Sequence, residues 1–136
     1  MRKASRRLTQ LYDDALMPSG LRSTQYTILF EIERAKGPPT LAQLASVLAM
    51  DRSTLGHNLR PLERDGLISL RQGADDRRQR RVVLTARGKA RFRNAEPLWK
   101  AAQRRFDQMF GEAEAADLRA TLLGIAYDER LRKLRG

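Results

Sequence analysis

Apolar residues recur at helical spacing along most of the chain. One stripe covers residues 2–16 and stops at the PSG sequence of residues 18–20, and a second covers residues 24–36 and stops at GPP, residues 37–39. Two shorter segments follow: a capping box of Thr40 and Gln43 opens the first, and Asp51 is a typical N-cap for the second, which Gly66 ends. The pattern therefore predicts four helices, of which the last two are short and closely connected.

The period changes after Gly66. Ile68 and Leu70 alternate with Ser69 and Arg71, as residues do in strands. Val82 and Leu84 alternate with Arg81 and Val83, and a polar, glycine-containing segment lies between the two runs. Thr85 is a suitable cap for a long helix over residues 86 to about 110, and Gly111 separates it from a last helix that carries apolar residues as far as Leu134. We therefore expect a mostly α fold with a small β-hairpin wing, a winged helix-turn-helix with N- and C-terminal dimerisation helices.

The last predicted helix has more apolar surface than the core of one chain can cover. A second copy of the chain would cover the rest, so we expect a homodimer. Within one structural domain overall, residues 1–17 and 95–136 are predicted to form the helical dimerisation region, and residues 18–94 the winged helix-turn-helix DNA-binding region.

The charge balance narrows the choice of partner. Lysine and arginine number 27 against 16 acidic residues, which gives a net charge of +11 and favours nucleic acid or another polyanion. No apolar run approaches the length of a membrane span and the N-terminus has no apolar signal core, so we expect a cytoplasmic protein without a membrane partner. The chain has no cysteine and a single histidine, His57, so no cofactor, no metal and no enzymatic activity are expected.

The helix after Asp51 has the pattern of a DNA-reading helix. Its leucines at positions 55, 59 and 62 share one face, which places Ser53, His57, Arg60 and Arg64 on or near the opposite face. Arginine and histidine side chains suit guanine edges in the major groove. An ordinary solvated helix face remains the alternative interpretation.

The predicted hairpin tip is strongly basic. Asp76, Arg77, Arg78 and Arg80 lie in it, and an arginine there would suit the minor groove while others contact phosphates. A charged, solvated loop is the alternative. Residues 51–93 contain 12 basic and 5 acidic side chains, so most of the positive charge lies on this segment, which favours a binding surface.

Several motifs together resemble the multiple antibiotic resistance regulator (MarR) family. They are DRSTLGHNLRPLERDGLI over residues 51–68, Asp76-x-Arg78, and VxLTxxG over residues 82–88, with LRSTQY at residues 21–26 and PLW at residues 97–99. The resemblance covers essentially the whole chain. It implies a two-fold dimer with interlocking terminal helices that binds a pseudo-palindromic operator in double-stranded DNA, usually as a repressor, and is released by a ligand or by oxidation.

The resemblance also implies residue roles. It makes Ser53, Thr54, His57 and Asn58 candidate readers of bases or backbone, and Arg78 the wing-tip residue steadied by Asp76. The complete set of expected DNA-binding residues is Arg52, Ser53, Thr54, His57, Asn58, Arg60, Arg64, Asp76, Arg77, Arg78 and Arg80. Many relatives have arginine where this chain has His57, so its base preference is expected to differ and to become sensitive to mildly acidic pH.

A pocket of the family type would lie between the dimerisation helices and the reading head. Its candidate lining residues are Tyr12, Leu16, Tyr26, Phe30 and Trp99, although core packing explains each of them equally well. Some relatives sense oxidants through a cysteine near the first helix, and this chain has none. It therefore either responds to a different signal, such as a small-molecule effector, or lacks a preceding sensing segment.

Two other binding functions share the basic composition. A non-sensing architectural protein would bind duplex DNA with little preference among sequences. An RNA-binding protein would need aromatic faces on which unstacked bases can lie, and no aromatic residue occurs between Phe30 and Phe92. A sequence-specific duplex reader is therefore the preferred interpretation.

Overall fold

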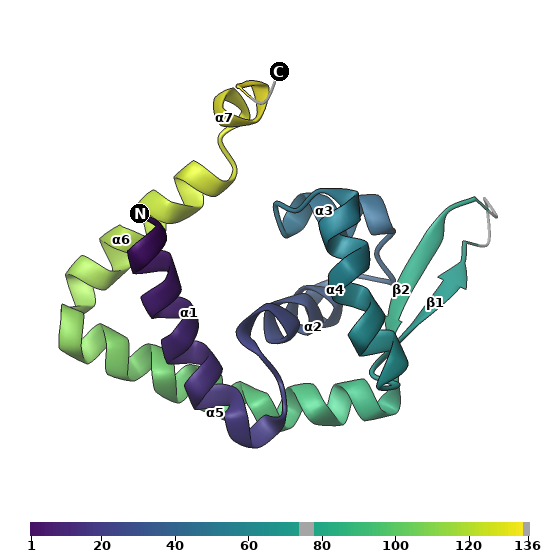
Figure 1. Cartoon of the computed structure of the whole chain (residues 1–136), viewed down its shortest axis with the longest axis horizontal. Helices are drawn as coiled ribbons and strands as arrows, with labels where there is room; N and C mark the ends of the chain where they lie inside the picture. Colours follow the sequence, from purple (N-terminus) through teal and green to yellow (C-terminus); the bar gives the residue numbers. More distant parts are fainter. Residues whose placement is uncertain (74–77, 135–136) are drawn as a thin grey trace. The chain divides into compact units, whose positions relative to one another are not determined.

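The computed structural model describes residues 1–73 and 78–134 (Figure 1). Residues 1–99 and residues 100–136 form two compact units. The first unit contains α1 (Arg2–Leu16), the 3-10 turn η1 (Met17–Ser19), α2 (Ser23–Arg34), α3 (Leu41–Val47), α4 (Arg52–Arg64), β1 (Ile68–Gln72), β2 (Arg80–Leu84) and the beginning of α5 (Ala86–Phe110). The second contains the end of α5, α6 (Glu112–Ala126) and α7 (Glu129–Lys133).

The two short helices begin at the predicted caps. The backbone N–H of Gln43 donates to Thr40 Oγ1 at 3.1 Å, and the N–H of Thr40 donates to Gln43 Oε1 at 3.0 Å, which completes the capping box of α3. The N–H of Thr54 donates to Asp51 Oδ1 at 2.7 Å at the start of α4. These bonds satisfy amides that have no partner within the helix, so the caps define where α3 and α4 begin.

The core of the first unit lies between α2, α3, α4 and the hairpin. Leu29 of α2, Leu44 of α3, Leu62 of α4 and Val82 of β2 are each at most 1% exposed. Burying such side chains stabilises the fold by about 1.5–3 kcal/mol each. The apolar stripes of the sequence are therefore the packed faces, and the predicted helix, helix, hairpin order is confirmed.

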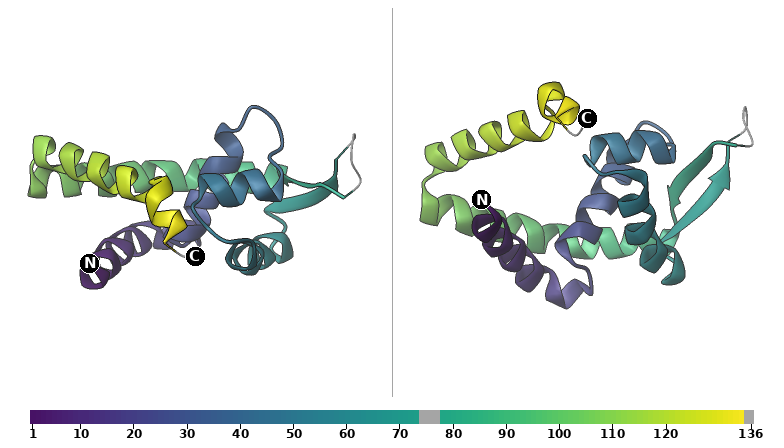
Figure 2. Two further views of the ribbon diagram at one scale, coloured as in Figure 1. Left: turned by 90° about the horizontal axis from the view of Figure 1, so that it is seen from above. Right: turned by 45° about the horizontal axis from the view of Figure 1, so that its top comes forward.

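The hairpin is attached to the helices along β2. Its antiparallel register runs from Ile68 opposite Leu84 to Gln72 opposite Arg80. On the other edge of β2, the N–H of Val82 donates to the carbonyl of Pro39 at 2.9 Å. The root of the hairpin is thus held by the segment before α3, while its other end projects away from α2, α3 and α4, as the two views of Figure 2 show.

Thr85 and Gly88 join the hairpin to the start of α5. The Thr85 hydroxyl donates to the carbonyl of Gly66 at 2.6 Å and accepts from the N–H of Gly88 at 3.0 Å. A Cβ atom at Gly88 would lie 1.9 Å from the carbonyl oxygen of Leu67, so only glycine fits this close approach. We call Gly66, Leu67, Thr85 and Gly88 the hairpin joint.

The single last helix predicted from the sequence was wrong, because the structure contains two helices there. The α6 helix ends at Ala126, and Asp128 caps the separate α7 by accepting from the N–H of Arg130 at 2.9 Å. A carboxylate that accepts from the backbone in this way favours a new helix start over continuation of the old one.

Apolar side chains remain exposed on the second unit. They are Met109, Phe110, Leu122, Leu123, Ile125, Tyr127, Leu131 and Leu134. Scattered exposed apolar residues are normal in proteins, but so many in one short segment are typical of an interaction surface.

Candidate nucleic-acid interface

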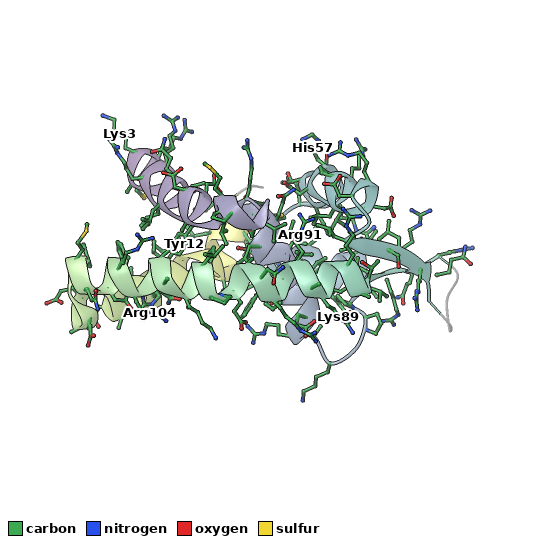
Figure 3. All side chains as sticks on the ribbon, turned by 90° about the horizontal axis from the view of Figure 1, so that it is seen from below. Lys3, Tyr12, His57, Lys89, Arg91 and Arg104 are labelled. Carbon is green, nitrogen blue, oxygen red and sulfur yellow. The ribbon has the colours of Figure 1, made fainter. Side chains whose placement is uncertain are left out.

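The face of α4 is set by three buried leucines. Leu55, Leu59 and Leu62 are 1%, 4% and 0% exposed and pack into the core of the first unit. Because residues one and two turns apart share a face, the polar side chains of α4 must lie on the other side. The exposed residues of α4 are Arg52, Ser53, Thr54, His57, Arg60, Glu63 and Arg64, and they include the four that leucine spacing placed on or near this side, Ser53, His57, Arg60 and Arg64. The side chain of His57 extends away from α5 in Figure 3.

Two polar residues of α4 have local partners. The Nδ2 atom of Asn58 donates to the carbonyl oxygen of Thr54 at 2.8 Å, which orients a half-buried side chain and leaves its Oδ1 an acceptor. Nε of Arg64 lies 3.4 Å from Oδ1 of the adjacent Asp65, an exposed ion pair that contributes little to stability. The side-chain amide of Asn58 is therefore held in place by a hydrogen bond, whereas the Arg64 side chain is held only by a weak, exposed ion pair.

The wing contributes arginines of two kinds. Arg81 is a structural residue, because its Nη1 donates to the carbonyl of Pro38 at 2.8 Å and fixes the hairpin to the chain before α3. Arg78 and Arg80 are exposed near the far end of the hairpin. Asp76 and Arg77 lie outside the described residues. The anchoring role of Arg81 was not predicted, since it depends on a partner 43 positions away in the sequence.

Three arginines that are separate in the sequence line one pocket. Arg52 and Arg60 come from α4 and Arg80 from β2, and the pocket has a volume of about 270 Å³. Its other lining residues are Leu41, Leu55, Gly56, Leu59, Glu63 and Leu70. The surface between α4 and the wing thus combines an apolar floor with concentrated positive charge, an arrangement that attracts anions.

The five candidate effector residues all lie in the first unit. Tyr12 stacks on Trp99 with ring centroids 4.1 Å apart, and Tyr26 stacks on Trp99 at 4.6 Å. Leu16 is fully buried, whereas Phe30 is 37% exposed and lies 6.4 Å from the Tyr26 ring. The rings pack chiefly on one another, which is the core packing that the sequence left open as an alternative.

Tyr26 is the buried titratable group of this aromatic cluster. Burial, and to a smaller extent the nearby carboxylate of Glu96, raises the pKa of Tyr26 to about 12. Its hydroxyl therefore stays protonated at physiological pH and can donate a hydrogen bond.

Neither a metal centre nor a membrane span is found in the part of the chain that the structure describes. Residues 1–73 and 78–134 hold no group of three or more His, Cys, Asp or Glu side chains placed to bind a metal ion. None of the helices described is both long enough and apolar enough to cross a membrane.

Comparison with known proteins identifies the family. The model of the MarR family matches residues 19–79. The chain is 37% identical to the Mycobacterium tuberculosis transcriptional regulator MosR, solved in complex with DNA, with a TM-score of 0.83 over 92% of this chain and 89% of that one. It is 28% identical to AbsC, a MarR family transcriptional regulator from Streptomyces coelicolor, with a TM-score of 0.83 over 96% of this chain and 88% of that one.

A further relative is the HTH-type transcriptional regulator YwoH of Bacillus subtilis (strain 168). It is 30% identical over 90 residues, which are 66% of this chain and 64% of YwoH. The match thus spans less than two thirds of that relative's length. With its helix, helix, hairpin core between terminal helices, and with these relatives, the chain belongs to the MarR family of transcriptional regulators.

Proposed function

We propose that the chain is a sequence-specific regulator that binds double-stranded DNA, acting as a repressor that a small ligand releases from a pseudo-palindromic operator. In this role α4 enters the major groove and the hairpin lies against the adjacent minor groove. Because its ligand would be chromosomal DNA, we place the protein in the cytoplasm. We propose no enzymatic activity for it.

The observation that carries this proposal is the two-sided character of α4. Its leucines are buried, and its other side presents His57, Asn58 and several arginines. Asn58 can present its Oδ1 and a second N–H to a base edge, since only one N–H is bonded to Thr54. The relative MosR, at 37% identity, was solved in complex with DNA, which supports DNA as the ligand of this chain.

We assign the remaining DNA-binding roles by position. The arginines that line the pocket, with Arg64 and the wing arginines 77 and 78, would contact phosphates or the minor groove, and Asp76 would steady Arg78. Ser53 and Thr54, exposed in the first turn of α4, would donate hydroxyl hydrogen bonds to backbone or bases.

The operator would have two half-sites because the protein would be a dimer. We propose that residues 1–17 and 95–136 form the dimerisation region and residues 18–94 the DNA-binding region. The exposed apolar side chains of α6 and α7 supply the surface that a second copy would bury. A two-fold dimer places its two reading helices about one DNA turn apart.

The effector would bind at the aromatic cluster of the first unit. The half-buried rings of Tyr12 and Trp99 and the partly exposed ring of Phe30 offer apolar faces, and the protonated hydroxyl of Tyr26 a hydrogen bond. The cluster is built from α1, α2 and α5, so a ligand among these rings would alter how the helices pack on one another.

The test is a comparison of specific and random DNA at one stated salt concentration. Duplexes enriched from a random library by the wild-type protein serve as operator, and affinities are measured by fluorescence anisotropy for the wild type, His57→Ala and Asn58→Ala. Removing a base-reading side chain should weaken operator binding by about 1–3 kcal/mol and leave random-duplex binding unchanged.

Two results would contradict the proposal. If no sequence is enriched, or if the wild type binds operator and random duplexes equally, the protein is an architectural duplex binder. If each alanine variant loses the same affinity on both kinds of DNA, neither residue reads bases.

A further inference from the structure

The first two turns of α1 are strongly basic. They carry Arg2, Lys3, Arg6 and Arg7, all exposed, and the first acidic residue of the chain is Asp13. We call these four residues the α1 basic patch. None of the four forms an ion pair with a carboxylate in residues 1–73 or 78–134.

This arrangement weakens α1 when the protein is free. Arg2 and Arg6 are four positions apart, as are Lys3 and Arg7, so each pair of like charges repels across one helical turn. Cations in a first turn also oppose the helix dipole. By contrast, α6 has two acidic residues in its first turn, Glu112 and Glu114. A bound polyanion would offset the repulsion.

Within the first unit, Lys3 of the patch lies on the same side as His57 of the reading helix. In Figure 3, Lys3 and His57 extend to one side of α5, whereas Lys89 extends to the other side. The view from above in Figure 2 agrees, with the N-terminus and α4 on the same side of α5. The α1 and α4 helices both belong to the compact unit of residues 1–99. A duplex bound to α4 would therefore lie on the side to which Lys3 is turned.

The order of the elements places the patch relative to a bound operator. Along the long axis of the figures, α4 lies between the hairpin and the start of α1. In the proposed dimer, residues 1–17 belong to the dimerisation region, so α1 lies toward the two-fold axis and the wing away from it. The patch is thus on the inner side of each reading helix.

We propose that the α1 basic patch binds DNA phosphates at the centre of the operator, between the two half-sites. The inference rests on the proposed function and adds to it a binding surface outside the winged helix-turn-helix region. Lysine and arginine contacts to phosphate carry no sequence information, so the patch would raise affinity for every duplex alike. Bound protein would therefore also protect the DNA backbone at the centre of the operator from hydroxyl-radical cleavage.

The test compares two matched double variants. Lys3→Gln/Arg7→Gln removes two positive charges four positions apart on α1. Lys89→Gln/Arg93→Gln removes two exposed charges with the same spacing on α5, starting from a residue turned to the other side. Both change the net charge equally, and glutamine keeps helix propensity. Circular dichroism and thermal unfolding should show both variants folded, with α1 no less stable.

The expected result is specific to the α1 variant. Its affinity for operator and for random duplex should fall by the same factor, and the slope of log K against log salt should decrease in magnitude by about 0.9 for each phosphate that the variant no longer neutralises. Hydroxyl-radical protection should disappear at the operator centre and remain at the half-sites. The α5 variant should show the smaller loss of affinity that a general reduction of charge causes.

Two outcomes would overturn the inference: unchanged DNA binding by the α1 variant, and equal losses of affinity in both variants. If DNA binding by the α1 variant is unchanged while its binding to vesicles containing phosphatidylserine is abolished, the patch binds lipid headgroups instead. The His57→Ala variant separates this inference from the proposed function. If His57→Ala loses operator preference while the α1 variant binds DNA normally, only the present inference fails. If His57→Ala keeps operator preference, the base-reading role of His57 fails, whatever the α1 variant shows.

Discussion

At the residue scale, the reading surface depends on which side chains are already bonded within the protein. Arg81 is committed to the carbonyl of Pro38, whereas Arg80, one position earlier, lines the pocket beside α4 with Arg52 and Arg60. Adjacent arginines on one strand therefore have different tasks, since successive side chains of a strand point to opposite faces. Substituting Arg81 would loosen the hairpin, and substituting Arg80 would remove a charge from the surface.

Arg78 provides the residue-scale test of the wing. Because its side chain is exposed near the far end of the hairpin, Arg78→Ala should weaken binding to operator and random duplexes with little change in thermal stability. The magnitude of the salt slope should fall by about one unit. Titrations at several salt concentrations measure this slope, and an unchanged slope would show that Arg78 does not contact phosphate.

Tyr26 gives the fold a dependence on alkaline pH. Its folded pKa of about 12 exceeds the ordinary value of 10.0, so the folded state favours the protonated phenol. The stabilisation is fully present below pH 10 and is lost as the pH rises from 10 toward 12. Between pH 9 and pH 11 the free energy of unfolding should fall by roughly 1 kcal/mol from this residue.

Urea unfolding of the wild type and Tyr26→Phe at both pH values isolates this contribution. All other titratable groups are common to both proteins. The phenylalanine variant should therefore lose less stability than the wild type, and equal losses of stability would refute the assignment.

At the element scale, the sequence predicted most boundaries because local chemistry defines them. The capping bonds of Thr40 and Asp51 and the stop at Gly66 involve residues within a few positions of one another. The α2 helix ends at Arg34, before the predicted stop at Gly37. The break before α7 was missed because Leu131 continues the apolar spacing of α6, and periodicity is insensitive to an interruption shorter than one turn.

Only part of the candidate site could be predicted from the sequence. The exposed face of α4 follows from leucine spacing alone, so its members were identified correctly as surface residues. The sequence did not predict that Arg80 lines the same pocket as Arg52 and Arg60, because this depends on how the hairpin packs beside α4. The hydrogen bond from the Asn58 side chain to the Thr54 carbonyl was also not predicted. That carbonyl can accept from a backbone N–H or from a side chain, and the sequence alone does not decide between them.

A pair of glycine substitutions tests the hairpin joint. Gly88→Ala would place a Cβ 1.9 Å from the Leu67 carbonyl oxygen, so α5 must shift, and we expect a loss of about 1–3 kcal/mol in unfolding free energy. Gly56→Ala in α4 is the matched control. No heavy atom lies within 4 Å of its new Cβ, so the better helix propensity of alanine should stabilise the protein by about 0.5–1 kcal/mol. Chemical denaturation without DNA measures both, and a neutral Gly88→Ala would show that the approach of α5 to Leu67 is not tight.

At the scale of the whole molecule, the state of association decides how DNA is read. Leu122 and Ile125 of α6 are 47% and 50% exposed in the single chain. In a homodimer they would be covered, so Leu122→Glu/Ile125→Glu should produce monomers. Light scattering should give about twice 15.5 kDa for the wild type and 15.5 kDa for the variant.

The same variant tests cooperation between half-sites. Operator affinity should fall together with the dimer, because each monomer can contact only one half-site. A matched Thr121→Glu variant introduces charge at another exposed position of α6. A wild type that stays at 15.5 kDa on concentration, with tight binding to a single half-site, would refute both the dimer and the palindromic operator.

The hairpin joint has a consequence for the kinetics of release. The Thr85 hydroxyl links the end of α4, the root of the wing and the first turn of α5 through two hydrogen bonds, and Gly88 brings α5 against Leu67. We therefore expect the reading helix and the root of the wing to move together. In the proposed function, major-groove and minor-groove contacts would break in a single step, so the lifetime of the complex on one half-site would show one exponential phase without a partly detached intermediate.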